Sequence, residues 1–134
     1  MIRGITFGAF DLFHAGHILM LAEAKTVCDH LTVCIQKDPS IDRPTKNTPI
    51  QNIVERQIQV KACTYVDDIL VYEREDDLLN ILRGVQWDIR IIGEEYYKKP
   101  FSGREEFGIK KIHWNKRAHQ FSSTELRKRV CQDK

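Results

Sequence analysis

The chain has 134 residues, of which 42% are hydrophobic and 30% are charged, and these proportions are ordinary for a single globular domain spanning residues 1–134. No apolar run approaches the roughly 18 residues that a bilayer-spanning helix needs, and the N-terminus lacks a signal-peptide pattern, so we expect a cytoplasmic protein without membrane contacts. The four cysteines show no CxxC spacing and are expected to be reduced thiols.

The net charge of +2 conceals an uneven distribution along the chain. Residues 67–106 contain eleven acidic and six basic side chains, whereas residues 110–134 contain eight basic and two acidic ones. The basic C-terminal segment has three interpretations: a solvated helix face, a nucleic-acid-binding surface, or a site for a small polyanion. The histidine-containing segment near the N-terminus favours the small polyanion, and we expect no nucleic-acid binding.

The first predicted elements are a strand and a helix with a distinctive segment between them. Residues 2–7 form an apolar, β-branched run that predicts a strand, and residues 16–28 carry apolar side chains at helical spacing. Free backbone N–H groups at a helix N-terminus bind phosphate, and two histidines three residues apart can face the same side. We therefore predict a phosphate site in the connecting segment Gly8-Ala9-Phe10-Asp11-Leu12-Phe13-His14-Ala15-Gly16-His17.

His14 and His17 also have two simpler interpretations. Histidine pairs at this spacing are usually ordinary core or surface residues, and a metal site would need a third ligand, for which Asp11 is a candidate. Gly8 and Gly16 allow a ligand to approach the backbone closely. Because the pattern G-x-F-D-x-x-H-x-G-H is long and specific, phosphate binding is the favoured interpretation.

The next elements are a second strand, a loop and a helix. Residues 30–36 predict the strand, and residues 37–49, with three prolines, predict the loop. Lys46 in this loop is either a solvated charge or a flexible cation that closes over a polyphosphate. Residues 50–63 predict a helix carrying Arg56, which is either a helix-surface residue or a substrate-binding cation.

The second half of the chain continues the alternation of strands and helices. Because strands separated by helices form parallel sheets, we predict an α/β fold. Residues 94–107 are expected to be irregular. The remaining predicted elements are strands at residues 68–72, 88–93 and 109–114, a helix at residues 76–82, and a final helix that begins at Ser122.

Ligands of parallel sheets bind beyond the carboxyl ends of the strands, and two more predicted segments reach that edge. The turn Gly93-Glu94-Glu95 is either a simple turn or a surface that accepts hydrogen bonds from a base amine. Arg117 and the serines and threonine at positions 122–124 form either an ordinary helix cap or a second anion site. Two anion sites at helix starts favour a polyphosphate lying between them.

The segment at residues 8–17 resembles the HxGH signature of the nucleotidylyltransferase superfamily. The resemblance runs from about Ile5 to Arg129, and in size and layout it is closest to the glycerol-3-phosphate cytidylyltransferases. Three further segments are similar to the YVDE, GDDW and RTEGIST motifs of cytidylyltransferases: Tyr65-Val66-Asp67-Asp68, Gly93-Glu94-Glu95-Tyr96, and Arg117 with Phe121-Ser122-Ser123-Thr124.

The resemblance implies a Rossmann-like three-layer sandwich with a parallel sheet of about five strands, a homodimer, and a reaction that requires Mg²⁺. A phosphate of a small acceptor would attack the α-phosphorus of CTP and release pyrophosphate. The catalytic residues it implies are His14, His17, Lys46 and Arg117. Lys46 and Arg56 would bind the acceptor, and Asp11 would lie near the phosphates or their Mg²⁺. The implied nucleotide-binding residues are Gly8, Ala9, Phe10, Asp11, Gly16, Gly93, Glu94, Ser122, Ser123 and Thr124.

The sequence departs from the family pattern at four places. Ala9 stands where Thr or Val is usual, and Thr64 stands where the glycerol-3-phosphate enzymes carry arginine. Residues 94–96 replace Asp-Asp-Trp, and residues 118–121 replace Thr-Glu-Gly-Ile. These differences argue more strongly against glycerol 3-phosphate as the acceptor than against CTP as the nucleotide. We expect a cytidylyltransferase that makes CDP-glycerol or a related product; an ATP-dependent adenylyltransferase and a non-catalytic nucleotide-binding regulatory module are the alternatives.

Overall fold

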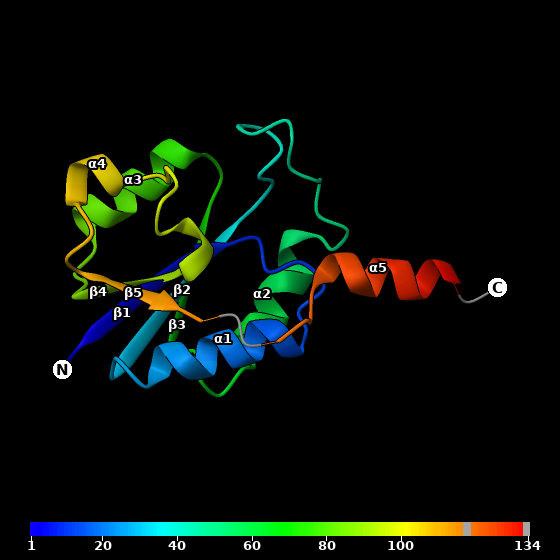
Figure 1. Cartoon of the computed structure of the whole chain (residues 1–134), viewed down its shortest axis with the longest axis horizontal. Helices are drawn as coiled ribbons and strands as arrows, with labels where there is room; N and C mark the ends of the chain where they lie inside the picture. Colours follow the sequence, from blue (N-terminus) through cyan, green and yellow to red (C-terminus); the bar gives the residue numbers. More distant parts are fainter. Residues whose placement is uncertain (117–118, 133–134) are drawn as a thin grey trace.

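A parallel sheet forms the centre of the structure, a computed structural model that describes residues 1–116 and 119–132 (Figure 1). Across these residues the strand order is β3-β2-β1-β4-β5. The chain starts in the middle of the sheet, adds β2 and β3 on one side, and then crosses back to add β4 and β5 on the other. The strands are β1 (Arg3–Gly8), β2 (His30–Gln36), β3 (Asp68–Tyr72), β4 (Ile89–Gly93) and β5 (Ile112–Asn115).

Helices cover both faces of this sheet. In Figure 1, α1 and α2 lie on one side of the strands, α3 and α4 lie on the other, and α5 extends away from the sheet toward the C-terminus. The predicted α/β three-layer fold with five parallel strands is therefore confirmed in the described part of the chain. The helices are α1 (Ala15–Lys25), α2 (Ile53–Lys61), α3 (Glu75–Gly84), α4 (Arg104–Phe107) and α5 (Ser123–Gln132), with a 3₁₀ turn, η1 (Glu94–Tyr96), after β4.

Strands β1 and β2 are apolar along most of their length because both faces of a parallel sheet are covered. Their register is continuous from the pair Arg3–His30 to the pair Gly8–Ile35. Alternate side chains of β2 enter two separate cores, with Val33 facing α1 and α2 and Cys34 facing α3. This double burial fixes the sheet, and with it the positions of the loops that follow each strand.

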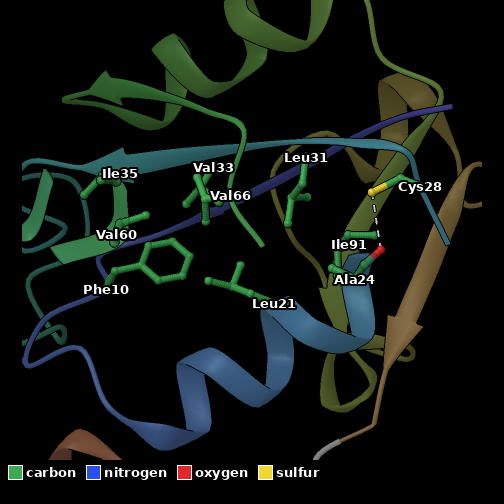
Figure 2. Close-up of a cluster of buried hydrophobic side chains, with 10 residues drawn as sticks. All are labelled: Phe10, Leu21, Ala24, Cys28, Leu31, Val33, Ile35, Val60, Val66 and Ile91. Carbon is green, nitrogen blue, oxygen red and sulfur yellow. Dashed lines mark hydrogen bonds between the residues drawn. The ribbon is translucent and has the colours of Figure 1, made fainter. Parts of the chain in front are cut away.

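The larger core lies between the sheet and helices α1 and α2 (Figure 2). The second core lies on the face covered by α3 and contains Ile5, Tyr72 and Leu82. Cys28 and Cys34 are buried in these cores, and all four cysteines, each within the described ranges, are free thiols as predicted. The larger core comprises Phe10, Leu21, Ala24, Cys28, Leu31, Val33, Ile35, Val60, Val66 and Ile91.

The predicted element boundaries differ from the structure at a few helix and strand ends. The helix expected at residue 50 begins at Ile53 because Asn52 caps it: the Asn52 side chain accepts from the Glu55 N–H at 2.8 Å. The segment at residues 94–107, expected to be irregular, contains η1 and α4. Within the described residues, no helix has the length and apolar character needed to cross a bilayer.

Candidate functional site

Two adjoining cavities open at the carboxyl ends of the strands. The histidine cavity, about 350 Å³, lies between the start of α1 and the start of α5, and it is lined by His14, His17 and His119 among others. The arginine cavity, about 380 Å³, lies over the sheet edge and beneath the loop that follows β2. The last residue of each described strand lines the arginine cavity: Gly8, Gln36, Tyr72, Gly93 and Asn115. Both cavities are lined by Met20, Gly93, Glu95 and Asn115, so they share a wall.

The start of α1 is capped by two histidines. His14 is the N-cap residue, and its Nδ1 accepts from the Gly16 N–H at 3.0 Å. His17 Nδ1 in turn accepts from the His14 N–H at 3.1 Å. This is the reciprocal arrangement of a capping box, in which Ser or Thr and Glu usually take these two places. Imidazoles replace them here, so the helix start is satisfied by side chains that also carry a second nitrogen.

The cap fixes the protonation pattern of both rings. Because Nδ1 accepts a hydrogen bond in His14 and in His17, each neutral ring carries its proton on Nε2. The two ring centroids lie 3.9 Å apart, and both side chains line the histidine cavity. The backbone of α1 therefore sets both histidines as Nε2–H donors, which is the form that suits phosphate oxygens.

His17 is neutral at physiological pH. Burial, and to a smaller extent the charge of His14, lower the pKa of His17 to about 3, although the charge of Asp11 opposes the shift. Its ring also stacks on Phe13, with 5.4 Å between the ring centroids. In the free protein His17 is thus a fixed hydrogen-bond donor and not a cation.

Gly16 allows the imidazoles to meet over the helix start. A Cβ atom at Gly16 would lie 2.7 Å from His119 Cε1 and 2.8 Å from His14 Cε1. His119 Nδ1 accepts from the Phe121 N–H at 3.1 Å, so its neutral form also carries the proton on Nε2. The sequence did not predict His119 as a residue of the candidate site. The one feature that could have indicated it is its position in a segment that differs from the RTEGIST motif.

The loop between β1 and α1 has a strained backbone. Phe10 and Leu12 both have φ = 51°, in the left-handed region that non-glycine residues seldom adopt. Figure 2 shows the Phe10 ring entering the larger core near Leu21 and Val60. A Cβ at Gly8 would lie 3.1 Å from this ring. Burial of Phe10 therefore holds the loop in a shape that turns His14 toward the cavity. The Phe10 ring itself packs in the core and lines neither cavity, in contrast to its predicted contact with the nucleotide.

Asp11 ties three segments together. Its carboxylate accepts from the Ile50 N–H at 2.8 Å, from the Gln51 N–H at 2.9 Å and from Arg127 Nη2 at 2.9 Å. The Asp11 carbonyl accepts from Ser123 Oγ at 2.8 Å. Burial raises the pKa of Asp11, but these hydrogen bonds and the Arg127 charge outweigh it, so the net pKa is lowered. Asp11 thus joins the HxGH loop to the start of α2 and to α5.

These contacts do not fit Asp11 as a Mg²⁺ ligand. Both carboxylate oxygens already accept hydrogen bonds, and the residue is 7% exposed. Over residues 1–116 and 119–132, no group of three or more His, Cys, Asp or Glu side chains is arranged to hold a metal ion. In nucleotide-dependent enzymes Mg²⁺ is commonly held by substrate phosphates and water.

Arg56 is buried and bonded to backbone carbonyls, in contrast to its predicted contact with the acceptor. The side chain is 1% exposed, which leaves no open surface for a ligand in this conformation. Its guanidinium donates to the carbonyls of Ala9 at 3.0 Å, Gln36 at 2.6 Å and Gln51 at 3.1 Å. Arg56 therefore clamps the chain segments that leave β1 and β2, and Ala9 takes part through its backbone carbonyl.

The start of α5 faces the HxGH loop. Ser122 Oγ accepts from the Glu125 N–H at 3.0 Å, which makes it a capping side chain. Ser122 and Ser123 line the histidine cavity. Thr124 is exposed and is not among its lining residues. The prediction for Arg117 falls on a position outside the described residues.

Of the two acids in the predicted turn Gly93-Glu94-Glu95 after β4, the one that lines the cavities is Glu95 and not Glu94, which was named as nucleotide-binding. Gly93 lines both cavities, and a Cβ there would lie 2.5 Å from the Glu95 carboxylate oxygens. Glu94 and Glu95 are both exposed, but Glu95 lines both cavities and Glu94 lines neither of them. Glycine at position 93 thus leaves room for the Glu95 carboxylate at the wall between the cavities.

The arginine cavity is lined by three cations from two segments. Arg43 and Lys46 come from the loop after β2, where Lys46 was predicted to bind a phosphate, and Arg90 is the second residue of β4. Glu75, at the start of α3, faces them, with its Oε1 atom 3.8 Å from Arg43 Nε. Arg43, Glu75 and Arg90 were missed as site residues because nothing in the sequence near each of them marks a site.

The family model described as "Cytidylyltransferase-like" matches residues 5–129. A bifunctional protein HldE from Caulobacter sp. (strain K31) is 35% identical over 69% of this chain, but the match covers 19% of HldE. An ethanolamine-phosphate cytidylyltransferase of Arabidopsis thaliana is 43% identical over 48% of the chain and 15% of the relative. The chain thus matches about a fifth or less of the length of these relatives.

A shorter relative and a solved structure cover more of the chain. An FAD synthase from Aciduliprofundum boonei is 33% identical over 78% of this chain and 67% of its own length. The crystal structure of a lipopolysaccharide core biosynthesis protein from Thermoplasma volcanium GSS1 is 25% identical, with a TM-score of 0.62 over 98% of this chain and 88% of that chain. Two of these relatives, the ethanolamine-phosphate cytidylyltransferase and the FAD synthase, are thus named for different reactions.

Proposed function

The chain belongs to the cytidylyltransferase-like family, and from this premise we propose that it is a nucleotidyltransferase that transfers CMP from CTP to the phosphate of a small acceptor, releasing pyrophosphate. The acceptor we propose is glycerol 3-phosphate, which would give CDP-glycerol. The observation that supports this most strongly is the pair of backbone-fixed Nε2–H donors, His14 and His17, in a cavity that adjoins a second, cation-lined one.

In this proposal the histidine cavity holds the triphosphate. Nε2–H groups of His14 and His17 donate to phosphate oxygens and stabilise the charge that develops at the α-phosphorus. Ser122 and Ser123 face the same space from α5. Because His17 is neutral before the nucleotide binds, its contribution is a directed hydrogen bond whose strength grows as negative charge accumulates on the phosphate.

The arginine cavity holds the acceptor in the same proposal. Arg43 and Lys46 would draw the acceptor phosphate toward the wall shared with the histidine cavity, where the α-phosphorus lies. An acceptor phosphate oxygen then attacks that phosphorus while the bond to the leaving pyrophosphate breaks. Positioning and electrostatics supply the catalysis, and a covalent protein intermediate is not needed.

Glu95 supports a base that carries an exocyclic amine. Its carboxylate lies beside Gly93 at the wall between the cavities and can only accept hydrogen bonds when ionised. Cytosine and adenine offer an amine donor there, whereas uracil and guanine present a carbonyl oxygen in the corresponding place. The family description favours CTP, and ATP is the second candidate because FAD synthase is among the relatives.

Mg²⁺, a dimer and a cytoplasmic location complete the proposal. The metal would supply charge neutralisation on the triphosphate, with Asp11 engaged in its own hydrogen bonds. Exposed apolar side chains on α2, Val54 and Ile58, support a face that pairs with a second copy of the chain. Free cysteines are consistent with a reducing compartment. Sedimentation analysis of the wild type and a V54E/I58E variant tests the dimer.

Pyrophosphate release tests the function directly. The purified chain is incubated with Mg²⁺, one of the four nucleoside triphosphates and a phosphorylated acceptor, and the product is identified by mass spectrometry. We expect release with CTP and a CDP-linked product. Release with ATP but not CTP would overturn the base assignment, and no release under any combination would overturn the enzyme assignment in favour of a nucleotide-binding module.

Glu94 and Glu95 provide a matched pair for the base assignment. Glu95→Ala should raise the KM for CTP by about tenfold because it removes a hydrogen-bond acceptor from a base that needs one. Glu94→Ala removes an exposed carboxylate one residue away and should leave this KM within about twofold of wild type. Equal effects of the two substitutions would contradict the role of Glu95.

A further inference from the structure

Arg90 is a buried cation with few partners. It lies in β4, is 7% exposed and lines the arginine cavity. Its Nη1 donates to the Ser102 carbonyl at 2.6 Å, whereas its buried Nε has no hydrogen-bond partner in the described residues. Buried charges in folded proteins are normally paired and fully hydrogen-bonded. Arg90 departs from this rule, and its burial in the sheet without a full set of hydrogen bonds calls for an explanation.

The surroundings hold the guanidinium in place without neutralising it. Its Cζ atom lies 5.0 Å from the Phe7 ring centroid and 5.4 Å from that of Phe101, so aromatic faces bracket it. Among the described residues, no carboxylate lies within 4.0 Å of it. The Glu75 carboxylate instead accepts from Ser102 Oγ at 3.2 Å and from Gln36 Nε2 at 3.3 Å.

The shortage of partners is concentrated in this cavity. In the described part of the chain, four buried polar side-chain atoms have no hydrogen-bond partner. Three belong to residues that line the arginine cavity: Arg43 Nε, Arg90 Nε and Asn115 Oδ1. Two of the three are donors on guanidinium groups. The cavity is lined by three cations, Arg43, Lys46 and Arg90, against two carboxylates, Glu75 and Glu95, and two of its buried guanidinium nitrogens lack acceptors.

We infer that the acceptor carries hydrogen-bond-accepting oxygens at the end remote from its reacting phosphate, and that Arg90 selects for them. Hydroxyl or carboxylate oxygens would accept hydrogen bonds from the cationic side chains that line this space, Arg43, Lys46 and Arg90. An ammonium group there would meet the buried guanidinium of Arg90, which has the same sign, while the nearby Glu75 carboxylate is already paired with Arg43. This inference rests on the proposed function and narrows it: a polyol or acid phosphate is accepted, and an amino-alcohol phosphate is rejected.

The inference separates this chain from one of its own relatives. The Arabidopsis relative is named for ethanolamine phosphate, whose remote end is an ammonium. Glycerol 3-phosphate has the same phosphate with two hydroxyl groups at the remote end. The two molecules are close in size, so the volume of the cavity would not distinguish them. The charge of the cavity and its hydrogen-bond donors would.

A panel of acceptors tests whether the wild-type protein prefers oxygen-ended acceptors over an amino-alcohol phosphate. Pyrophosphate release is followed with CTP, Mg²⁺ and either glycerol 3-phosphate, 3-phosphoglycerate or phosphoethanolamine. We expect kcat/KM for at least one oxygen-ended acceptor to exceed that for phosphoethanolamine by about tenfold or more. Equal or faster release with phosphoethanolamine would overturn the inference and the choice of glycerol 3-phosphate, and would leave the proposed transfer of CMP from CTP standing. No release with any acceptor would overturn both.

Substitution of Arg90 tests whether this residue is the selector. Arg90→Gln should raise the KM for the oxygen-ended acceptor by about tenfold, narrow its advantage over phosphoethanolamine, and leave the KM for CTP within about twofold. Arg83→Gln removes an exposed arginine of α3, outside both cavities, and should change neither ratio. An unchanged acceptor ratio in folded R90Q would overturn the role of Arg90. If R90Q does not fold, the acceptor ranking of the wild type still decides the inference.

Discussion

The two cavities differ in how the chain builds them. The histidine cavity takes two of its three imidazoles from one turn of α1, where the backbone fixes both rings. The arginine cavity takes Arg43, Glu75, Arg90 and Ser102 from four separate segments, and it has buried donors without partners. The first site is centred on a single helix start; the second is assembled by the tertiary fold and contains two buried guanidinium donors without hydrogen-bond partners. In our proposal, the chemistry resides in the first cavity and the choice of acceptor in the second.

The largest expected effect comes from the local site. His17→Ala should lower kcat by about 10²–10³ because it removes a hydrogen bond that strengthens in the transition state. Pyrophosphate release under saturating substrates measures this. His30→Ala, which removes an imidazole paired with Asp68 at the sheet edge, is the control and should stay within about twofold. A His17→Ala rate within a few-fold of wild type would place the chemistry elsewhere.

The connection between the HxGH loop and its neighbours has the next largest expected effect. Asp11→Asn should lower the free energy of unfolding by about 2 kcal/mol, since hydrogen bonds to a charged group contribute about 1.5–3 kcal/mol. Urea denaturation at pH 7 measures the change. An unaltered midpoint in this variant would show that the three hydrogen bonds at Asp11 contribute nothing to stability.

The lowered pKa of Asp11 also gives this contribution a pH dependence. The stabilisation is fully present above the unfolded value of 3.8 and is lost as the pH falls through the lower folded pKa. The difference between wild type and Asp11→Asn should therefore shrink in strong acid. A difference that grows as the pH falls below 3.8 would contradict the assignment.

A pair of glycine substitutions tests whether close approach of the imidazoles matters. Gly16→Ala should lower kcat/KM for CTP by about tenfold, because its Cβ would displace His14 and His119. Gly84→Ala, at the end of α3, introduces the same methyl group where no atom lies within 4 Å. It should leave the kinetics unchanged, so a similar loss in both variants would indicate a general effect on folding.

The smallest expected effect belongs to the loop over the arginine cavity. Lys46→Ala should raise the KM for the acceptor by about threefold to tenfold, because an exposed, flexible lysine contributes a point charge without fixed geometry. Lys128→Ala on the exposed side of α5 is the matched control. A larger effect on the KM for CTP than on that for the acceptor would move Lys46 to the nucleotide side of the site.

The same contrast explains what the sequence could predict. The strands and the HxGH segment were found because their patterns are local: apolar runs, a helix start and two histidines at fixed spacing. Arg90 was not found because its cavity is formed by residues far away in the chain, such as Phe7 and Gln36. Arg56 was interpreted as a surface or substrate residue because its carbonyl partners lie up to 47 residues away. Periodicity alone cannot identify an arginine that is buried by such distant contacts.

A crystal structure with bound CTP is the most direct test of the proposal that the histidine cavity binds the triphosphate and the arginine cavity binds the acceptor. We predict that phosphate oxygens lie within hydrogen-bond distance of Nε2 of His14 and His17, that the base amine faces Glu95, and that the space around Arg90 stays open for the acceptor. A triphosphate bound instead by Arg43, Lys46 and Arg90, with the histidine cavity empty, would contradict the assignment of both cavities.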